Sequence, residues 1–522
     1  MSRSTRAAGR RSAPRATRSR QRSLRARTTS KAIGLTLLSA LVPGSGLLMG
    51  GRKKLGAFVL TISIGLLLIG GYFGLTKRDS ILAFAVSPRQ LLIATAAVVL
   101  LGVAWIWVVV ASHKLLRPVS MTYTGRLAGS LFVGVLCFAI AVPTTVAAQT
   151  VMAQRDLVGS VFQSEGKSKS ATRPKVNAKD PWANTPRLNL LLLGADDGVG
   201  RTGVRTDTVI VASIDTKTGD TALISLSRNW MRMPFPEDSP LHKIYPDGFY
   251  DPNGPAEQPE YYLDSMYDNI PKAHPGVLGQ TDNMGADVVK LAAGAALGLD
   301  IDYYMQVNLA GFRQIIDALG GITVNVNYRV PIGGDYGEGP GSNTEKKPSG
   351  YIEPGPNQKL DGYHALWFAR GRYGLSDPSR QERQRCTIHA LVNSANPQAL
   401  VTSYQQIAKA GKQLLRTDIP QEILPAFIQL ALKVKNAKVS NIDLDKSKNF
   451  PTGQHPNYPA MQEIIQNAIA PKTKSVASTP TTKPTKKPGS GSTKKPVKPA
   501  VTPGSAQNLA DACAYNPSQT GN

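Results

Sequence analysis

Acidic and arginine side chains cluster just beyond the ends of predicted strands. Asp196 follows the apolar run 188–193, Arg205 and Asp207 open the next apolar run, and Arg228 comes directly after a third. Carboxylate oxygens are hard ligands that Mg²⁺ takes alongside substrate phosphates. Guanidinium groups grip phosphate oxygens in pairs. These residue types predict a site for a phosphorylated substrate, with Asp196 and Asp207 as ligands of a Mg²⁺ cofactor.

A second group of basic residues lies further along the chain. Arg370 and Arg372 are two residues apart, so on a strand they would share one face. Arg380 and Gln384 are four apart, so they would share one face of a helix, and Asp377 would be its N-cap. Taken singly, each arginine also fits a solvated surface charge. Taken as a set, they favour an anion site that stabilises charge building on a leaving phosphate.

The elements that must position these residues alternate between strands and helices, which predicts an α/β domain with a mixed central sheet flanked by helices. Residues 332–358 are rich in Gly and Pro and predict a loop. The predicted strands cover 188–193, 208–214, 221–226, 303–307 and 322–326, and the predicted helices cover 285–298, 309–319 and 380–395.

A helical transmembrane region is predicted to precede this domain. Residues 55–75, 91–112 and 128–148 each have about the 20 apolar residues that a spanning helix needs. The apolar stretch 33–50 is interrupted by Pro43 and two glycines, so it is interpreted as a surface or re-entrant segment. Three spans keep the basic residues at 52–54 inside and place the C-terminal region outside the plasma membrane. The positive charges in the loop 76–90 oppose this bias.

The composition divides the rest of the chain and limits its partners. The formal net charge is +26 and is unevenly distributed, since the first thirty residues are rich in arginine and carry no acid. This arm is interpreted as a topology anchor beside the membrane lipids, the alternative being a nucleic-acid-binding arm.

Cys386 and Cys513 could pair if their region lies outside the cell. The predicted order is a disordered arm 1–30, a membrane region 31–148, a stalk 149–186, a catalytic domain 187–400, a helical extension 401–470 and a disordered tail 471–522.

Over roughly residues 187–395, the chain resembles the LytR-CpsA-Psr family of cell-wall glycopolymer ligases. Several ordered motifs at compatible spacing make the resemblance specific, whereas no single motif would suffice. They are Gly194-Ala195-Asp196, Arg205-Thr206-Asp207-Thr208, Ser225-Leu226-Ser227-Arg228, Asp317-Ala318-Leu319-Gly320-Gly321-Ile322 with Val324, Leu360-Asp361-Gly362 with Ala365-Leu366, Arg370-Gly371-Arg372, and Asp377-Pro378-Ser379-Arg380 with Arg383-Gln384.

The resemblance implies a Mg²⁺-dependent phosphotransferase. Such proteins take an anionic glycan from a polyprenyl diphosphate carrier, attach it through a phosphodiester to a hydroxyl of peptidoglycan, and release polyprenyl phosphate. The polyprenyl chain is expected in an apolar tunnel between the sheet and the helices. By position in the motifs, Asp196 and Asp207 would hold the metal. The diphosphate would be held by Arg205, Arg228, Arg370, Arg372, Arg380 and Gln384, with Asp377, Arg383 and Lys243 as further substrate-binding residues.

The chain departs from the family pattern in two places. Ser227-Arg228-Asn229 stands where the family commonly has Pro-Arg-Asp, which removes a carboxylate and puts any role as a base there in doubt. The multi-span anchor replaces the usual single span and looks actinobacterial. A protein that binds or senses lipid-linked wall precursors without turning them over is the alternative function.

Overall fold

The computed structural model describes residues 28–76, 84–119, 122–175, 177–178, 180–195, 204–336, 345–394, 415–442, 444, 456–470 and 507–517. The chain forms two compact units, residues 1–78 with 92–152 and residues 79–91 with 153–522. The predicted arm up to residue 27, the tail 471–506 and Asp196 lie outside the described residues.

The first unit is helical and contains the predicted membrane segments. Among the described residues, three helices are long and apolar enough to cross a membrane, and each contains one of the three predicted spans. These are α3 (Lys53–Thr76), α5 (Pro88–Leu116) and α6 (Tyr123–Val161). Helix α6 continues thirteen residues beyond the predicted end of its span at residue 148, so the first part of the predicted stalk is helical.

The interrupted apolar stretch forms two short helices, α1 (Thr29–Leu41) and α2 (Ser45–Met49). They are separated at Gly44, whose φ of 99° is left-handed. A 13-residue helix is about 20 Å long, which is shorter than the hydrocarbon core. Side chains fix α1 against α5, since the hydroxyls of Ser39 and Ser112 are 2.8 Å apart and Trp105 Nε1 donates to Ala40 O at 3.0 Å.

The second unit is built on a seven-stranded mixed sheet, which confirms the predicted fold class. The strand order is β11-β10-β3-β2-β1-β4-β9. Strands β1, β2 and β3 pair antiparallel, whereas β4 is parallel to β1 and β10 is parallel to β3. Their bounds are β1 Arg187–Ala195, β2 Thr206–Asp215, β3 Thr221–Leu226, β4 Tyr303–Asn308, β9 Leu415–Thr417, β10 Val439–Ile442 and β11 Gln507–Asn508.

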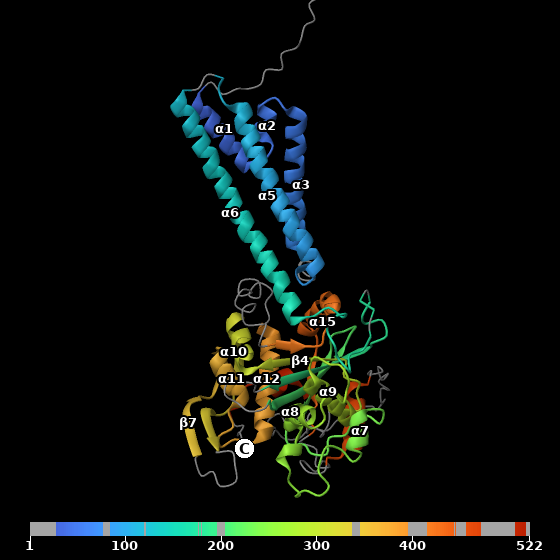
Figure 1. Ribbon diagram of the computed structural model, residues 1–522. Coiled ribbons are helices and arrows are strands. Elements are labelled where there is room, and N and C mark those ends of the chain that lie inside the picture. The colour runs from blue at the N-terminus through green and yellow to red at the C-terminus, as the bar shows by residue number, and fades with distance from the viewer. Residues whose placement is uncertain are drawn as a thin grey trace, which may run out of the picture. The chain divides into compact units, whose positions relative to one another are not determined.

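Apolar residues on both faces of the sheet explain the continuous apolar run in β1. Leu191 and Leu193 pack into one core with helices α8 (Leu263–Ala273), α9 (Met284–Leu297) and α16 (Tyr458–Ile469). Leu188 packs into a second core on the other face with α15 (Leu424–Lys435). Three further helices, α10 (Leu309–Ala318), α11 (Gly362–Arg370) and α12 (Asp377–Ser394), lie together beside β4 (Figure 1).

The predicted loop over residues 332–358 is wrong. The segment contains β6 (Val330–Tyr336), β7 (Glu345–Ile352) and most of β8 (Gly355–Leu360). Strands β6 and β7 form a hairpin, and β8 pairs with β5 (Ile322–Val326). The glycines mislead because Gly333 and Gly334, both with positive φ, lie beside a register shift within β6 instead of ending it.

The ends of the domain also differ from the prediction. The part of the predicted stalk after α6 docks onto the domain, where Asp287 accepts hydrogen bonds from Ala171 N at 3.0 Å and Thr172 Oγ1 at 2.6 Å. The predicted helical extension includes β9 and β10. Residues 507–517 were predicted to be disordered but contribute β11 and α17 (Leu509–Ala512) to the fold. The remaining short helices are α7 (Pro240–Ile244), η1 (Pro259–Tyr261) and η2 (Gln421–Ile423).

A disulfide between Cys386 and Cys513 joins α12 to the residue after α17. The Cα atoms are 5.6 Å apart. The carbonyl oxygen of Cys513 also accepts a hydrogen bond from Asn325 Nδ2 at 2.9 Å. The C-terminal segment is therefore attached to the helix that carries Arg380 and Gln384.

Replacing Cys386 and Cys513 together by serine is expected to lower the free energy of unfolding by about 2–4 kcal/mol, because the bridge closes a long loop in the unfolded chain. The two cysteines are 127 residues apart. Denaturant unfolding of the full chain in detergent measures the loss, and Cys137→Ser provides the control. Equal stability of the double variant and the wild type would contradict a structural bridge.

Candidate active site

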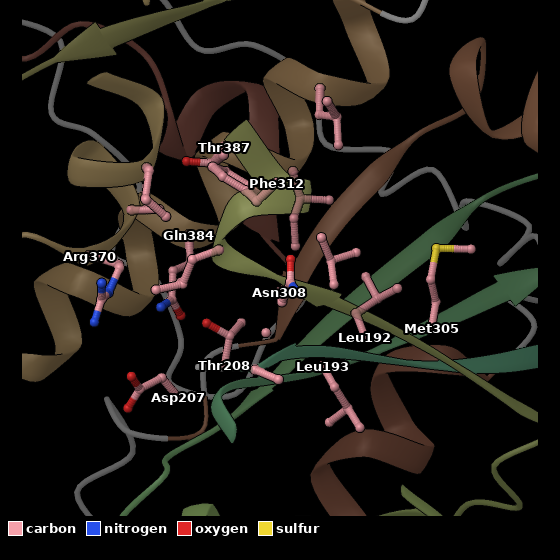
Figure 2. A pocket seen from close by; sticks show the side chains of 18 of the residues that line it. Leu192, Leu193, Asp207, Thr208, Met305, Asn308, Phe312, Arg370, Gln384 and Thr387 are labelled. Carbon is pink, nitrogen blue, oxygen red and sulfur yellow. The ribbon is translucent and has the colours of Figure 1, made fainter. Parts of the chain in front are cut away.

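A cavity of about 220 Å³ lies between the sheet and helices α10, α11 and α12. Its wall includes apolar side chains, among them Leu192, Met305 and Phe312, and charged ones, among them Asp207 and Arg370. Figure 2 shows Asp207, Arg370 and Gln384 on one side of the view and Met305 on the other. The full lining is Leu192, Leu193, Gly194, Ala195, Asp207, Thr208, Met305, Val307, Asn308, Leu309, Phe312, Leu366, Ala369, Arg370, Arg380, Gln384, Thr387, Ile388 and Leu391.

Strand register brings Asp207 and Arg228 together. Val209 near the start of β2 pairs with Leu226 at the end of β3. Asp207 therefore lies close to Arg228, which follows the end of β3 by two residues. Arg228 Nη1 donates to Asp207 Oδ1 at 2.6 Å. The ion pair is only partly shielded, with 15% of the arginine side chain and 24% of the aspartate side chain exposed.

The surrounding arginines keep Asp207 ionised. Burial alone would raise the pKa of Asp207, but Arg228, Arg380 and Arg370 together outweigh it and lower the pKa below its ordinary value. The pKa of Arg228 is raised in turn. Burial alone would lower it, but the negative charge of Asp207 and the hydrogen bond to it outweigh burial. The stabilisation from an ionised Asp207 is thus present at neutral pH and is lost only as the pH falls through this lowered pKa.

Arg380 lies in the first turn of α12 with only 6% of its side chain exposed. Its Nη2 donates to Asp377 Oδ1 at 2.9 Å. Asp377 is the first residue of α12, and the predicted N-cap role belongs instead to Ser376, whose Oγ accepts from Ser379 N at 3.4 Å. The Nε atoms of Arg380 and Arg228 are both buried and have no hydrogen-bond partner among the described residues. These donors are the kind that an anionic ligand satisfies.

Arg370 and Arg372 do not lie on a strand, so the prediction that they share a strand face is wrong. Arg370 is the last residue of α11, and Arg372 lies in the turn before α12. Asp361 is the N-cap of α11, and its carboxylate accepts a hydrogen bond from His364 N at 2.8 Å. This bond fixes where the helix begins. Burial, and then the charges of Arg228 and Arg372, lower the pKa of Arg380 despite the opposing Asp377. The end of α11 and the start of α12 therefore converge on one positive region.

The arrangement has the motifs and the order of a known family. The profile of the LytR_cpsA_psr family matches residues 156–470, which is more than half of the chain. The protein belongs to this family.

Two relatives from the LytR-CpsA-Psr family each share less than 30% sequence identity with the chain. The chain is 27% identical over 267 residues to "Polyisoprenyl-teichoic acid--peptidoglycan teichoic acid transferase TagU" of Bacillus subtilis, covering 50% of this chain and 68% of that relative. It is 29% identical over 250 residues to the protein of the same name from Oceanobacillus iheyensis, covering 46% and 62%. A structure of the "LytR-Csp2A-Psr enzyme from Actinomyces oris" is similar with a TM-score of 0.37 and 16% identity, covering 57% of this chain and 94% of that chain.

Not every residue predicted for the LytR-CpsA-Psr site reaches the cavity. Asp207, Arg370, Arg380 and Gln384 line it. Lys243 is exposed on α7 and does not line the cavity. Arg205 is 55% exposed, with its Nη1 3.9 Å from Asp264 Oδ2.

Arg383 has a different position from the one predicted for a substrate-binding residue. It is 4% exposed, and its Nη1 and Nη2 donate to the carbonyl oxygens of Phe368 and Gly371. Its Nε donates to Tyr328 Oη at 3.2 Å. The guanidinium therefore binds the backbone that carries Arg370 and Arg372, and does not face the cavity.

Asp264 is a site residue that sequence reasoning missed. It lies in the first turn of α8, its side chain is 2% exposed, and its Oδ2 is 4.0 Å from Arg228 Nη1. Its amide donates to Arg228 O at 3.1 Å, which fixes α8 beside the loop after β3. Burial raises the pKa of Asp264, and Arg228 and Arg205 oppose the rise. An acid at a helix start is a common sequence feature, so no signal distinguished this one.

The described residues could contribute to a divalent-cation site but do not complete one. No group of three or more His, Cys, Asp or Glu side chains that could hold a metal occurs in the described part of the chain. Asp207 uses Oδ1 for Arg228, and its Oδ2 makes no hydrogen bond to another described residue. An ionised carboxylate with a free oxygen is the type of ligand that Mg²⁺ takes, usually one or two carboxylates together with phosphate oxygens and water.

Replacing Arg383 by methionine is expected to destabilise the protein by about 2–4 kcal/mol, because it leaves two buried carbonyl groups without their donor. Thermal or denaturant unfolding of the full chain measures this loss. Arg329→Met is the matched control, since Arg329 is 59% exposed in a surface pair with Glu353. Similar stability of the two variants would show that Arg383 does not hold the α11–α12 turn.

Proposed function

We propose that the protein is a phosphotransferase that moves an anionic glycopolymer from a polyprenyl diphosphate carrier to a hydroxyl of peptidoglycan. One observation carries the proposal: a single cavity joins an apolar wall to Asp207, Arg370, Arg380 and Gln384. A ligand that fits it has a hydrophobic chain and an anionic head. The TagU relatives are named for a polyisoprenyl-linked teichoic acid, which is a ligand of this kind, and for its transfer to peptidoglycan.

Different cavity residues would contact the two ends of the lipid. Leu192, Met305 and Phe312 provide the surface against which an isoprenoid chain packs. Arg370 and Arg380 lie where the diphosphate head would bind. Planar guanidinium groups bind phosphate oxygens in pairs, which orients the head relative to the acceptor.

The transfer step conserves atoms and charge as follows. The acceptor hydroxyl oxygen attacks the phosphorus that bears the glycan, and the new P–O bond forms as the bond to the polyprenyl phosphate oxygen breaks. The bonding electrons leave with polyprenyl phosphate, and the hydroxyl proton is lost to a base. Negative charge grows on the leaving phosphate, and the arginines around Asp207 stabilise it because they are already in place.

Mg²⁺ is proposed as the cofactor. Asp207 is its ligand among the described residues, and Asp196 is the second ligand proposed from the sequence motif. A bound Mg²⁺ would supply charge stabilisation at the phosphate oxygens. Asp207 would hold the ion in place while the arginines hold the lipid head.

The domain is proposed to work on the outer side of the plasma membrane, as part of a multi-pass protein. In the part of the chain that the structure describes, three helices are long and apolar enough to span. With the basic arm inside, an odd number of spans places the second unit outside. The Cys386–Cys513 disulfide supports this side, since such bridges persist in oxidising compartments. A polyprenyl diphosphate stays in the bilayer, so its transferase must work near the lipid surface.

Transfer can be tested with the full chain in nanodiscs, Mg²⁺, a polyprenyl diphosphate-linked glycan and peptidoglycan. Arg370→Met is expected to slow release of polyprenyl phosphate by about 10²–10³-fold, because a preorganised donor at the leaving phosphate is lost. Arg329→Met serves again as a control and should release it at the wild-type rate. If the wild type binds the lipid but never releases polyprenyl phosphate, the protein is a sensor and the transferase proposal fails.

Membrane orientation is tested by protease treatment of intact cells that carry a C-terminal epitope. The proposal predicts that the second unit is cleaved from outside while a cytoplasmic marker protein stays intact. Permeabilised cells provide the positive control. Protection of the C-terminal region in intact cells would place it inside and refute the three-span topology.

A further inference from the structure

Arg228 lies between two carboxylates that use the same atom of its guanidinium. Its Nη1 is 2.6 Å from Asp207 Oδ1 and 4.0 Å from Asp264 Oδ2. Among the described residues, the Arg228 side chain donates to Asp207, and its buried Nε has no partner. The guanidinium is therefore held on one side by a single bond.

The ion pair with Arg228 opposes the binding of a metal ion by Asp207. Asp207 is the described carboxylate that fits a divalent cation, yet a guanidinium already neutralises it at 2.6 Å. A cation that approaches Asp207 would meet the positive charge of Arg228, and two cations on one carboxylate repel each other strongly in a partly buried site. Binding of the cation to Asp207 is therefore favoured when Arg228 moves to another anion.

Asp264 is positioned to be that anion. Its backbone amide is bonded to Arg228 O at 3.1 Å, and its Oδ1 accepts from Ser265 Oγ at 3.3 Å. Its Oδ2 makes no hydrogen bond to a described residue and faces Arg228 Nη1 and Arg205 Nη1 at 4.0 and 3.9 Å. A shift of about 1 Å would bring the Arg228 guanidinium to hydrogen-bond distance from it.

We propose that Arg228 exchanges Asp207 for Asp264 when a divalent cation binds. In the cation-free state, the Arg228 guanidinium pairs with Asp207 and blocks the cation site. In the cation-bound state, Arg228 would pair with Asp264, which would leave the Asp207 carboxylate to hold the cation. Asp264 is thus a positioning residue, which acts on the cation through Arg228. The inference rests on the proposed function for the cation at Asp207.

The exchange predicts how cation affinity responds to three substitutions. Mn²⁺ is the probe, and its binding to the full chain in nanodiscs is followed by electron paramagnetic resonance without lipid substrate. Asp264→Asn removes the second partner of Arg228 and is expected to weaken Mn²⁺ binding at least about fivefold. Arg228→Gln removes the competitor and is expected to tighten binding by a similar factor. Asp207→Asn removes the ligand and should abolish the signal from this site.

A double variant separates exchange from the general loss of a negative charge. In Arg228→Gln with Asp264→Asn, the exchange leaves affinity within about twofold of Arg228→Gln alone, because there is no guanidinium to move. A field effect from Asp264 weakens binding by the same factor in both backgrounds. Asp268→Asn is the matched control on α8, since Asp268 pairs with Lys272 and is expected to leave Mn²⁺ affinity unchanged.

The outcomes distinguish the exchange from the proposed function. Equal weakening by Asp264→Asn with and without Arg228, or no tightening in Arg228→Gln, overturns the exchange and leaves the transferase proposal standing. Absence of Mn²⁺ binding that depends on Asp207 in the wild type overturns both the exchange and the cation site. If Asp264→Asn fails to fold in thermal melts, Arg228→Gln alone decides, because the exchange requires that it bind Mn²⁺ more tightly.

Discussion

The ion pair between Asp207 and Arg228 is the interaction around which the site is organised. Antiparallel pairing of β2 and β3 brings the start of β2 beside the end of β3, and Arg228 in the turn after β3 then reaches Asp207. Arg380 and Arg370 then come close enough to help lower the pKa of the same carboxylate. One carboxylate shared among several guanidinium groups leaves the region positively charged, which is the condition for holding a diphosphate.

Keeping so many arginines together requires structure beyond the sheet. Arg383 holds the α11–α12 turn through two backbone carbonyls, and the Cys386–Cys513 bridge attaches α12 to the end of the fold. The two buried Nε atoms without a partner remain as unsatisfied donors among the described residues. Such buried donors cost free energy in the folded protein.

Much of the fold was predictable because local patterns specify it. The apolar run of β1, the Gly298 cap of α9 and the broken helix at Gly44 all follow from rules that act within a few residues. Within the site, the motif residues Asp207 and Arg228 were predictable from sequence. The role of Arg383, the contact of Asp264 with Arg228 and the hairpin at 330–352 were not, because they depend on contacts between distant segments and on glycines inside a strand instead of at its end.

The central claim is that one cavity holds the isoprenoid chain and presents its phosphate head to the arginines. An experimental structure of the full chain with bound polyprenyl phosphate tests this claim most directly. The account predicts a phosphate within hydrogen-bond distance of Arg370 and Arg380, with the chain running past Met305 and Phe312. A lipid bound elsewhere on the second unit, with this cavity empty, would contradict it.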